Sequence, residues 1–178
     1  MMTFAIGMTA RRVSGAVVVC AAFAAAAPSV LAQAPPAHPA SHNGVEGVWF
    51  DHSGRGAIEI VACGARLCGY IYWVKDTTRQ GKPVVDKLNP DPKRRDQPIC
   101  GTRILANLTP NGALQPNRVW TGGQIYNPEE GESCDAEITL ITPERLSVLG
   151  YAGIKMFGET FTWTRAPTDL VRCGPPRV

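Results

Sequence analysis

Short runs of alternating apolar and polar residues fill the chain from about residue 45 to residue 166. In Ala136-Glu137-Ile138-Thr139-Leu140 every second residue is apolar, and in residues 160–165 threonines alternate with Phe, Trp and Arg. A period of two is typical of β-strands with one buried face, and Gly, Pro, Asn and Asp separate the runs. The pattern predicts eight strands, over residues 45–51, 57–63, 67–75, 101–108, 118–126, 133–142, 145–151 and 159–166.

No amphipathic helical period interrupts these runs, so we expect an all-β protein. A single antiparallel, up-and-down barrel of eight strands would remove the exposed edges of an open sheet. Alternation turns Arg165 inward beside Trp163, where an arginine needs a partner or an aromatic face. Trp49 on the first strand is the natural candidate, and this pair resembles the closure of lipocalin-like barrels. We therefore expect Trp49, Trp163 and Arg165 to be structural.

An up-and-down order sorts the connections to two ends of the barrel. We call the end where the first strand begins the lower end, which takes the connections 64–66, 109–117 and 143–144 and the C-terminus. The upper end takes the longer and more polar connections, 52–56, 76–100, 127–132 and 152–158. Trp49 and Arg165 fall at the lower end, so functional residues are expected at the upper end.

The first 32 residues have the features of a secretory signal peptide. Arg11 and Arg12 precede the apolar run from Val13 to Ala27, and small residues end the segment at Ala32. A membrane anchor is the alternative, but the run is short for a bilayer core of ~30 Å. We expect a signal peptide over residues 1–32, a flexible Pro/Ala-rich tether over 33–44, the barrel over 45–167 and a C-terminal tail over 168–178.

The charge of the chain argues against a nucleic-acid partner. Removing residues 1–32 takes away two arginines and no acid, so the formal net charge falls from +3 to +1. A nearly neutral chain lacks the basic surface that nucleic acids require. No further apolar run is long enough to span a membrane, and we expect a periplasmic or secreted protein.

Five cysteines follow the predicted signal peptide, and export favours disulfide formation. We expect Cys63 to pair with Cys68 across the second hairpin, and Cys100 with Cys134 at the upper end. Cys173 then remains unpaired at the lower end, or replaces one member of the Cys63–Cys68 pair. Free buried thiols are the alternative for each of these cysteines.

Residues 76–100 form the longest connection, and long loops of this kind are often functional. Asp86, Asn89, Asp91 and Arg95 are its candidate ligand-binding residues. The three Asp and Asn side chains also carry oxygens that suit calcium, although their spacing is not that of an EF-hand. We expect instead a loop bonded to itself, with Arg95 bound to the carboxylate of Asp86 or Asp91, and we predict no metal site.

The other upper connections add Tyr126, Asn127 and Tyr151 to the candidate ligand-binding residues. Glu129 and Glu130 offer acid or base groups, but a solvated hairpin turn, with positive φ at Gly131, is the simpler interpretation. An enzyme would also have His52 available, although no nucleophile–base pair is visible in the sequence. Residues 151–158 are apolar for an exposed loop and suggest a lid, a lining or an interaction surface.

An ordered set of motifs runs from Gly47 to Arg165. It comprises Gly-x-Trp, Cys-Gly-x-x-Leu-Cys-Gly, Asn-Pro-Asp-Pro with a following Arg and Pro-x-Cys-Gly, Gly-Gly-x-Ile-Tyr-x-Pro-x-x-Gly, Gly-Tyr-x-Gly-Ile-x-x-Phe-Gly and Thr-Trp-Thr-Arg. The set resembles the bacterial domain-of-unknown-function family 2147. The resemblance implies an exported, lipocalin-like barrel and leaves the function open. Asn127 stands where that family usually has Asp, Gln97 where it has a second Arg, and Cys134 where it has Tyr.

Three functions remain open from the sequence. The first is a noncatalytic barrel that binds a small ligand, an apolar one included, at the upper end. The second is an envelope module that binds another protein through residues 76–100 and 152–158. The third is an enzyme that uses the carboxylates of Asp86, Asp91, Glu129 or Glu130. We predict no cofactor.

Overall fold

The computed structural model describes residues 44–112 and 118–174, which lie in one compact unit. The predicted signal peptide, nearly all of the tether and the end of the predicted tail lie outside the described residues, and those boundaries stay predictions. The elements are β1 (Gly47–Phe50), β2 (Gly56–Cys63), β3 (Arg66–Val74), β4 (Thr78–Arg79), β5 (Lys82–Pro83), the 3-10 helix η1 (Pro92–Arg94), β6 (Arg103–Pro110), β7 (Val119–Asn127), β8 (Glu132–Thr142), β9 (Arg145–Tyr151), the 3-10 helix η2 (Lys155–Phe157) and β10 (Glu159–Arg165).

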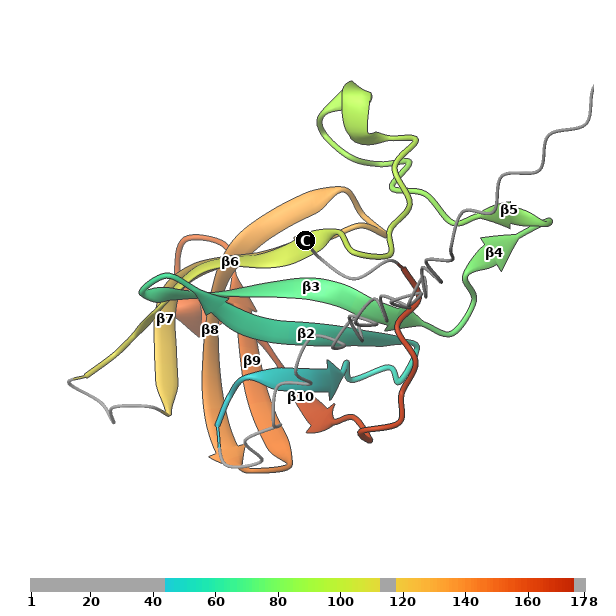
Figure 1. Cartoon of the computed structure of the whole chain (residues 1–178). Coiled ribbons are helices and arrows are strands. Elements are labelled where there is room, and N and C mark those ends of the chain that lie inside the picture. Colours follow the sequence, from blue (N-terminus) through green and yellow to red (C-terminus); the bar gives the residue numbers. More distant parts are fainter. Residues whose placement is uncertain (1–43, 113–117, 175–178) are drawn as a thin grey trace, which may run out of the picture. The chain divides into compact units, whose positions relative to one another are not determined.

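Eight antiparallel strands close into a barrel in the order β1-β10-β9-β8-β7-β6-β3-β2 (Figure 1). β1 closes it by pairing with both β2 and β10. The predicted fold class is confirmed, and each predicted strand overlaps a strand of the barrel. The hairpin of β4 and β5, within the long connection, was not predicted, because strands of two residues carry no alternation.

Apolar side chains from all eight strands fill the barrel interior. Close packing explains two glycines here. A methyl group at Gly69 would lie 2.8 Å from Cβ of Leu105, and one at Gly123 would lie 2.5 Å from Cγ of Leu108. Both leucines are completely buried, so these glycines make room for them. The buried cluster also contains Trp49, Ile58, Ile60, Leu67, Ile71, Trp120, Ala136, Ile138, Leu140, Leu146, Val148 and Trp163. Ile104 is buried too, but it precedes Leu105 on β6 and therefore belongs to the outer face.

Arg165 and Trp49 close the lower end. They are partners in the register of β1 and β10, and the guanidinium lies 3.9 Å from the centre of the indole. The guanidinium donates to the carbonyls of Gly44 (2.6 Å), Glu46 (3.2 Å) and Pro143 (2.5 Å). Burial lowers the pKa of Arg165 from its ordinary value, because it disfavours the charged form. The three carbonyl dipoles and the indole ring stabilise the charge in this position.

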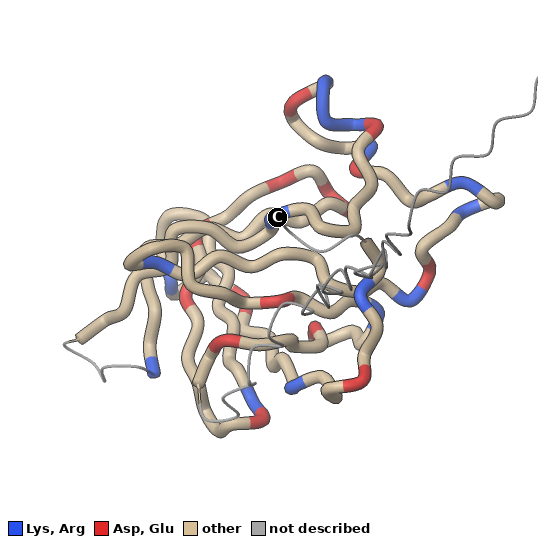
Figure 2. The backbone as a smooth tube through the Cα atoms, viewed as in Figure 1, with Lys and Arg blue, Asp and Glu red and all other residues tan. Residues whose placement is uncertain are grey.

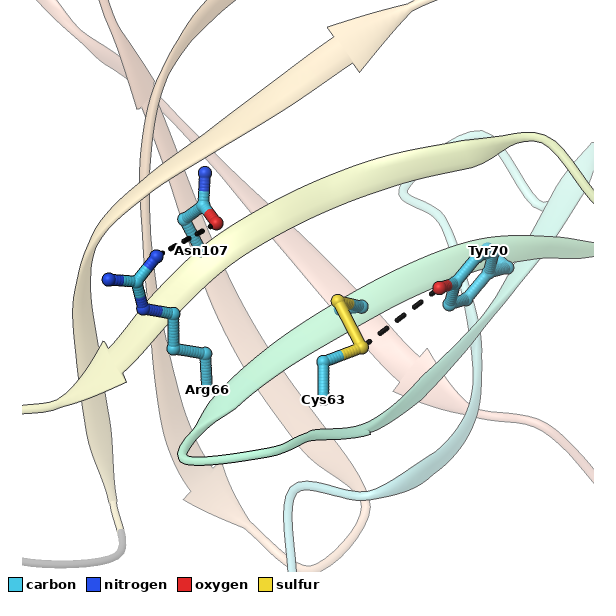
Figure 3. The surroundings of a disulfide bond; sticks show 5 residues. Cys63, Arg66, Tyr70 and Asn107 are labelled. Carbon is cyan, nitrogen blue, oxygen red and sulfur yellow. Dashed lines mark hydrogen bonds between the residues drawn. A yellow bond between two sulfur atoms is a disulfide. The ribbon is translucent and has the colours of Figure 1, made fainter.

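The predicted Cys63–Cys68 disulfide is present and crosses the β2–β3 hairpin near its turn. Figure 3 shows its surroundings, where Sγ of Cys63 lies 3.9 Å from the hydroxyl of Tyr70. Beside it, Arg66 donates to the side-chain oxygen of Asn107 at 3.2 Å and links β3 to β6. The bridge therefore reinforces a hairpin that the β-ladder already holds.

The predicted Cys100–Cys134 disulfide is wrong, because Cys100 pairs with Cys173. After β10 the chain runs back over the outer face of β2 and β3. Tyr72 donates to the carbonyl of Leu170 at 3.0 Å, and Arg172 pairs with Glu59 and covers the ring of Tyr72 at 4.4 Å. The tail thus carries Cys173 to the upper end, not the lower end.

Cys134 is the free cysteine among the described residues. It lies on the inward side of β8 with Ala136 and Ile138, and β7 separates it from β6. Burial raises the pKa of its thiol.

Within the described ranges, no helix has the length and apolar character needed to cross a membrane.

Candidate functional site

The long connection between β3 and β6 is folded against itself at its base. Val85 and Pro98 form a β-bridge, the amide of Asp86 donates to the carbonyl of Gln97 at 3.0 Å, and the amide of Ile99 donates to Val84 at 3.1 Å. These bonds separate the β4–β5 hairpin from an upper loop, residues 86–97. Figure 1 shows this upper loop, which contains η1, projecting from the barrel.

Asp86 is the centre of the upper loop. Only 2% of it is exposed, and its two carboxylate oxygens accept hydrogen bonds from the hydroxyl of Tyr126 (2.7 Å) and the amide of Asn89 (2.6 Å). Burial, followed by the bond to Asp86, raises the pKa of Tyr126 from 10.0 to about 12. Tyr126 therefore stays protonated at neutral pH and ties the loop to β7.

Asn89, Asp91 and Arg95 form the rest of the loop's internal network. Asn89 accepts from the amide of Asp91 at 2.9 Å, and Asp91 accepts from the amide of Lys93 at 3.0 Å, which caps η1. Arg95 donates through Nε to the carbonyl of Asn89 at 2.8 Å. The expected bond from Arg95 to a carboxylate is therefore wrong, because the loop's turn presents a carbonyl to Arg95 while Asp86 faces Tyr126.

The side-chain oxygens that would suit calcium accept hydrogen bonds here. Asp86, Asn89 and Asp91 each use a side-chain oxygen to accept a hydrogen bond from the loop or from Tyr126. Within the part of the chain that the structure describes, no three His, Cys, Asp or Glu side chains lie close enough together to hold a metal ion. The loop's oxygens order the loop itself.

The upper loop rests on the β7–β8 turn. Gly131 has φ of +74°, as the sequence predicts for this turn, and a methyl group there would lie 2.1 Å from the carbonyl oxygen of Leu88. Asn127 shapes the turn through two hydrogen bonds. Its side-chain oxygen accepts from the backbone amide of Glu129 at 3.0 Å, and its backbone carbonyl accepts from the amide of Gly131 at 2.8 Å. Asn127 thus stabilises the turn on which the upper loop rests.

A pocket of about 200 Å³ opens between the upper loop and the barrel. Leu105 is completely buried and pairs with Ile125, while the next pair, Ala106 and Gln124, belongs to the opposite face. The pocket therefore lies on the outer wall near the upper end, not inside the barrel. We call it the outer-wall pocket; it is lined by Asn89, Pro90, Arg94, Thr102, Arg103, Ile104, Ala106, Gln124, Tyr126 and Ser133.

Two of the predicted binding residues, Asn89 and Tyr126, line the outer-wall pocket, and Asp86 holds both of them. Tyr151 lies elsewhere: it is paired with Asp135 across β9 and β8, and Lys155, ion-paired with Glu137, lies 5.7 Å from its ring.

Sequence reasoning missed Arg94, Arg103, Gln124 and Ser133. Alternation would have placed Gln124 on the face of Tyr126, and the hairpin register would have placed Ser133 opposite Tyr126.

His52, Asp51 and Glu129 each contact a different partner at the upper end. The ring of His52 stacks on Phe161 at 4.4 Å. His52 also lines an open groove of about 380 Å³, together with Phe50, Asp51, Ser53, Gly54, Thr162 and Thr164. Asp51 accepts from Ser53, and Glu129, with 78% of its side chain exposed, lies 3.9 Å from Arg55.

Comparisons with known proteins agree with this architecture. A family model described as an uncharacterized protein conserved in bacteria (DUF2147) matches residues 47–165. No curated protein matches. A solved structure of protein HP1028 from Helicobacter pylori, which is described as belonging to the lipocalin family, is 23% identical. It aligns with a TM-score of 0.61 over 71% of this chain and 86% of that chain. The chain therefore belongs to the bacterial family DUF2147 and has a lipocalin-like β-barrel fold.

Proposed function

We propose that this protein is an exported, noncatalytic barrel that binds a small ligand in the outer-wall pocket. The observation that carries the proposal is a loop fixed over the wall of a filled barrel by a buried carboxylate, with an open pocket beneath it. Because Trp49, Trp163 and the buried leucines occupy the interior, the outer wall takes the place of the central cavity of a ligand-binding barrel.

The disulfides support the proposed location. Cys63–Cys68 and Cys100–Cys173 are typical of proteins that fold in an oxidising compartment. Together with the predicted signal peptide over residues 1–32, they favour the periplasm or secretion.

A thermal-shift screen tests binding, because a ligand at 100 times its Kd stabilises the native state by about 2.7 kcal/mol. Ser133→Trp fills the outer-wall pocket, and Ser147→Trp adds the same side chain to the outward side of β9, between the inward-facing Leu146 and Val148. We expect compounds that stabilise the parent protein to stabilise the Ser147 variant equally and the Ser133 variant much less. Equal shifts in both variants would place binding elsewhere.

A second function, docking to an envelope protein, is favoured by the loop that follows β9. Ile154, Met156 and Phe157 are 59%, 85% and 79% exposed, which is unusual for three large apolar side chains in one turn. A photo-crosslinking residue at position 156 tests it in living cells, with position 171 as the control because Val171 is 78% exposed. A discrete product from position 156 alone would support docking, and equal labelling at both positions would refute it.

A further inference from the structure

The outer-wall pocket carries positive charge without an internal counter-ion. Of its ten lining residues, two are arginines and none is acidic. Arg94 comes from the upper loop and Arg103 from the first position of β6, and both are exposed. Among the described residues, no carboxylate lies within ion-pair distance of either guanidinium, whereas the adjacent Arg95 is held by a carbonyl. Figure 2 shows the basic and acidic positions along this loop.

Two neutral donors share the pocket with these arginines. The amide of Gln124 and the hydroxyl of Ser133 have no hydrogen-bond partner within the described residues, and they stand on neighbouring strands. The other polar groups are already used: Tyr126 and the amide of Asn89 donate to Asp86, and Thr102 donates to the carbonyl of Pro98. The pocket therefore offers hydrogen-bond donors to a ligand that accepts.

Asp86 places one negative charge behind the pocket, against the two positive charges of Arg94 and Arg103. Its oxygens point to Tyr126 and Asn89, and only 2% of the residue is exposed, so it is not available to bind a cation from solvent. Asp135 is opposite Gln124 in the register of β7 and β8, but it does not line the pocket. The charged side chains that line the pocket are the two arginines, so the charge facing the ligand is positive.

The pocket's size and its apolar residues restrict the ligand further. A volume of about 200 Å³ corresponds to roughly six or seven water molecules. Pro90, Ile104 and Ala106 supply apolar surface next to the donors. An anion with a short apolar portion matches both parts of the lining.

We propose, on the basis of the proposed function, that the outer-wall pocket binds a small organic anion. Arg94 and Arg103 hold its carboxylate or phosphate, Gln124 and Ser133 donate to the same group, and the short apolar portion contacts Pro90, Ile104 and Ala106. Guanidinium groups suit both kinds of anion because they bind two oxygens at once.

Calorimetric titration of the purified protein with butyrate, ethyl phosphate, inorganic phosphate and butyramide tests this class. We expect butyrate or ethyl phosphate to bind, and inorganic phosphate and the neutral butyramide to bind at least about tenfold more weakly. Butyrate and ethyl phosphate separate a carboxylate ligand from a phosphate ligand. Binding should also weaken as ionic strength rises.

Variants assign the binding to the two arginines. Arg94→Gln and Arg103→Gln should each lower the affinity for the anion roughly tenfold or more, because each variant loses a charge-assisted hydrogen bond. Arg79→Gln removes the same charge from the exposed β4–β5 hairpin and should leave the affinity unchanged. The inference would be overturned by an equal loss of affinity in all three variants or by no loss of affinity in the first two. It would also be overturned if neither butyrate nor ethyl phosphate bound.

Ser133→Trp separates this inference from the proposed function. If butyramide binds as well as butyrate and only Ser133→Trp abolishes both, the pocket binds a ligand but not through its charge, and the anion inference is overturned. If Ser133→Trp changes no titration while the compounds bind, the pocket is not the binding site and both proposals fail.

Discussion

Replacing Arg165 with Met should destabilise the barrel without affecting the outer-wall pocket. The arginine lies at the lower end, over Trp49. It joins β10 to the stretch before β1, through the carbonyls of Gly44 and Glu46, and to the β8–β9 turn, through the carbonyl of Pro143. Met keeps an apolar cover on the indole but removes the charge and all three donors.

The size of the effect follows from these contacts. Each of the three hydrogen bonds contributes about 1 kcal/mol to the free energy of unfolding, because water can bind the carbonyl once the donor is gone. The cation–π contact contributes about 1 kcal/mol more. The thioether recovers part of this by packing on Trp49, because sulfur–aromatic contacts stabilise by about 0.3–1.5 kcal/mol. We therefore expect the free energy of unfolding to fall by about 2–4 kcal/mol.

Urea denaturation measures this loss. With a slope of about 2 kcal/mol per molar, the midpoint should fall by about 1–2 M. Arg145→Met is the matched control, since Arg145 is exposed at the start of β9 and has no ion pair within the described residues. An Arg165 variant as stable as the Arg145 variant would refute the reasoning, as would a loss of ligand affinity in its folded fraction.

Three further predictions concern the upper end. Because the pKa of Tyr126 is raised from 10.0 to about 12, its contribution to stability should be intact below pH 10 and lost between pH 10 and 12. Phenolate absorbance follows the titration of Tyr126. Asp86→Asn should lower this pKa, and an unchanged titration in that variant would count against the contact. Gly131→Ala combines φ of +74° with a 2.1 Å clash, so it should cost about 2–4 kcal/mol and speed amide exchange in residues 86–97; unchanged exchange would contradict this. Replacing Cys100 and Cys173 with Ser should lower stability by roughly 4 kcal/mol in calorimetry, and a loss below about 1 kcal/mol would contradict the loop-entropy argument for a separation of 73 residues.

The strands were predictable because alternation reports which face is buried. The lower-end pairing of Trp49 with Arg165 followed from the same pattern, and the register of β1 and β10 places them opposite each other. Cys63–Cys68 was predictable because a hairpin turn separates the two cysteines.

The route of the tail and the wall of the pocket were not predictable in this way. Residues 166–174 carry no alternation, and side-chain contacts with Tyr72 and Glu59 hold them on β2 and β3. In the upper loop, Arg94 and Arg95 are equivalent by composition. The 3-10 turn at residues 92–94 is what turns one toward the pocket and the other toward the loop's own backbone.

The Cys100–Cys173 disulfide also determines how the molecule would respond to mechanical force. The bridge and the backbone between its cysteines form a covalent ring that contains β6, β7, β8, β9 and β10, while β1, β2 and β3 lie outside it. A pull on the two ends of the chain would pass through the sulfur atoms, and within the barrel it would extend only β1, β2, β3 and the connection to Cys100. The backbone of the ring, with a sequence separation of 73 between its cysteines, would keep roughly 250 Å of chain hidden until the bridge is reduced. In single-molecule stretching, oxidised protein should therefore extend by that much less than reduced protein.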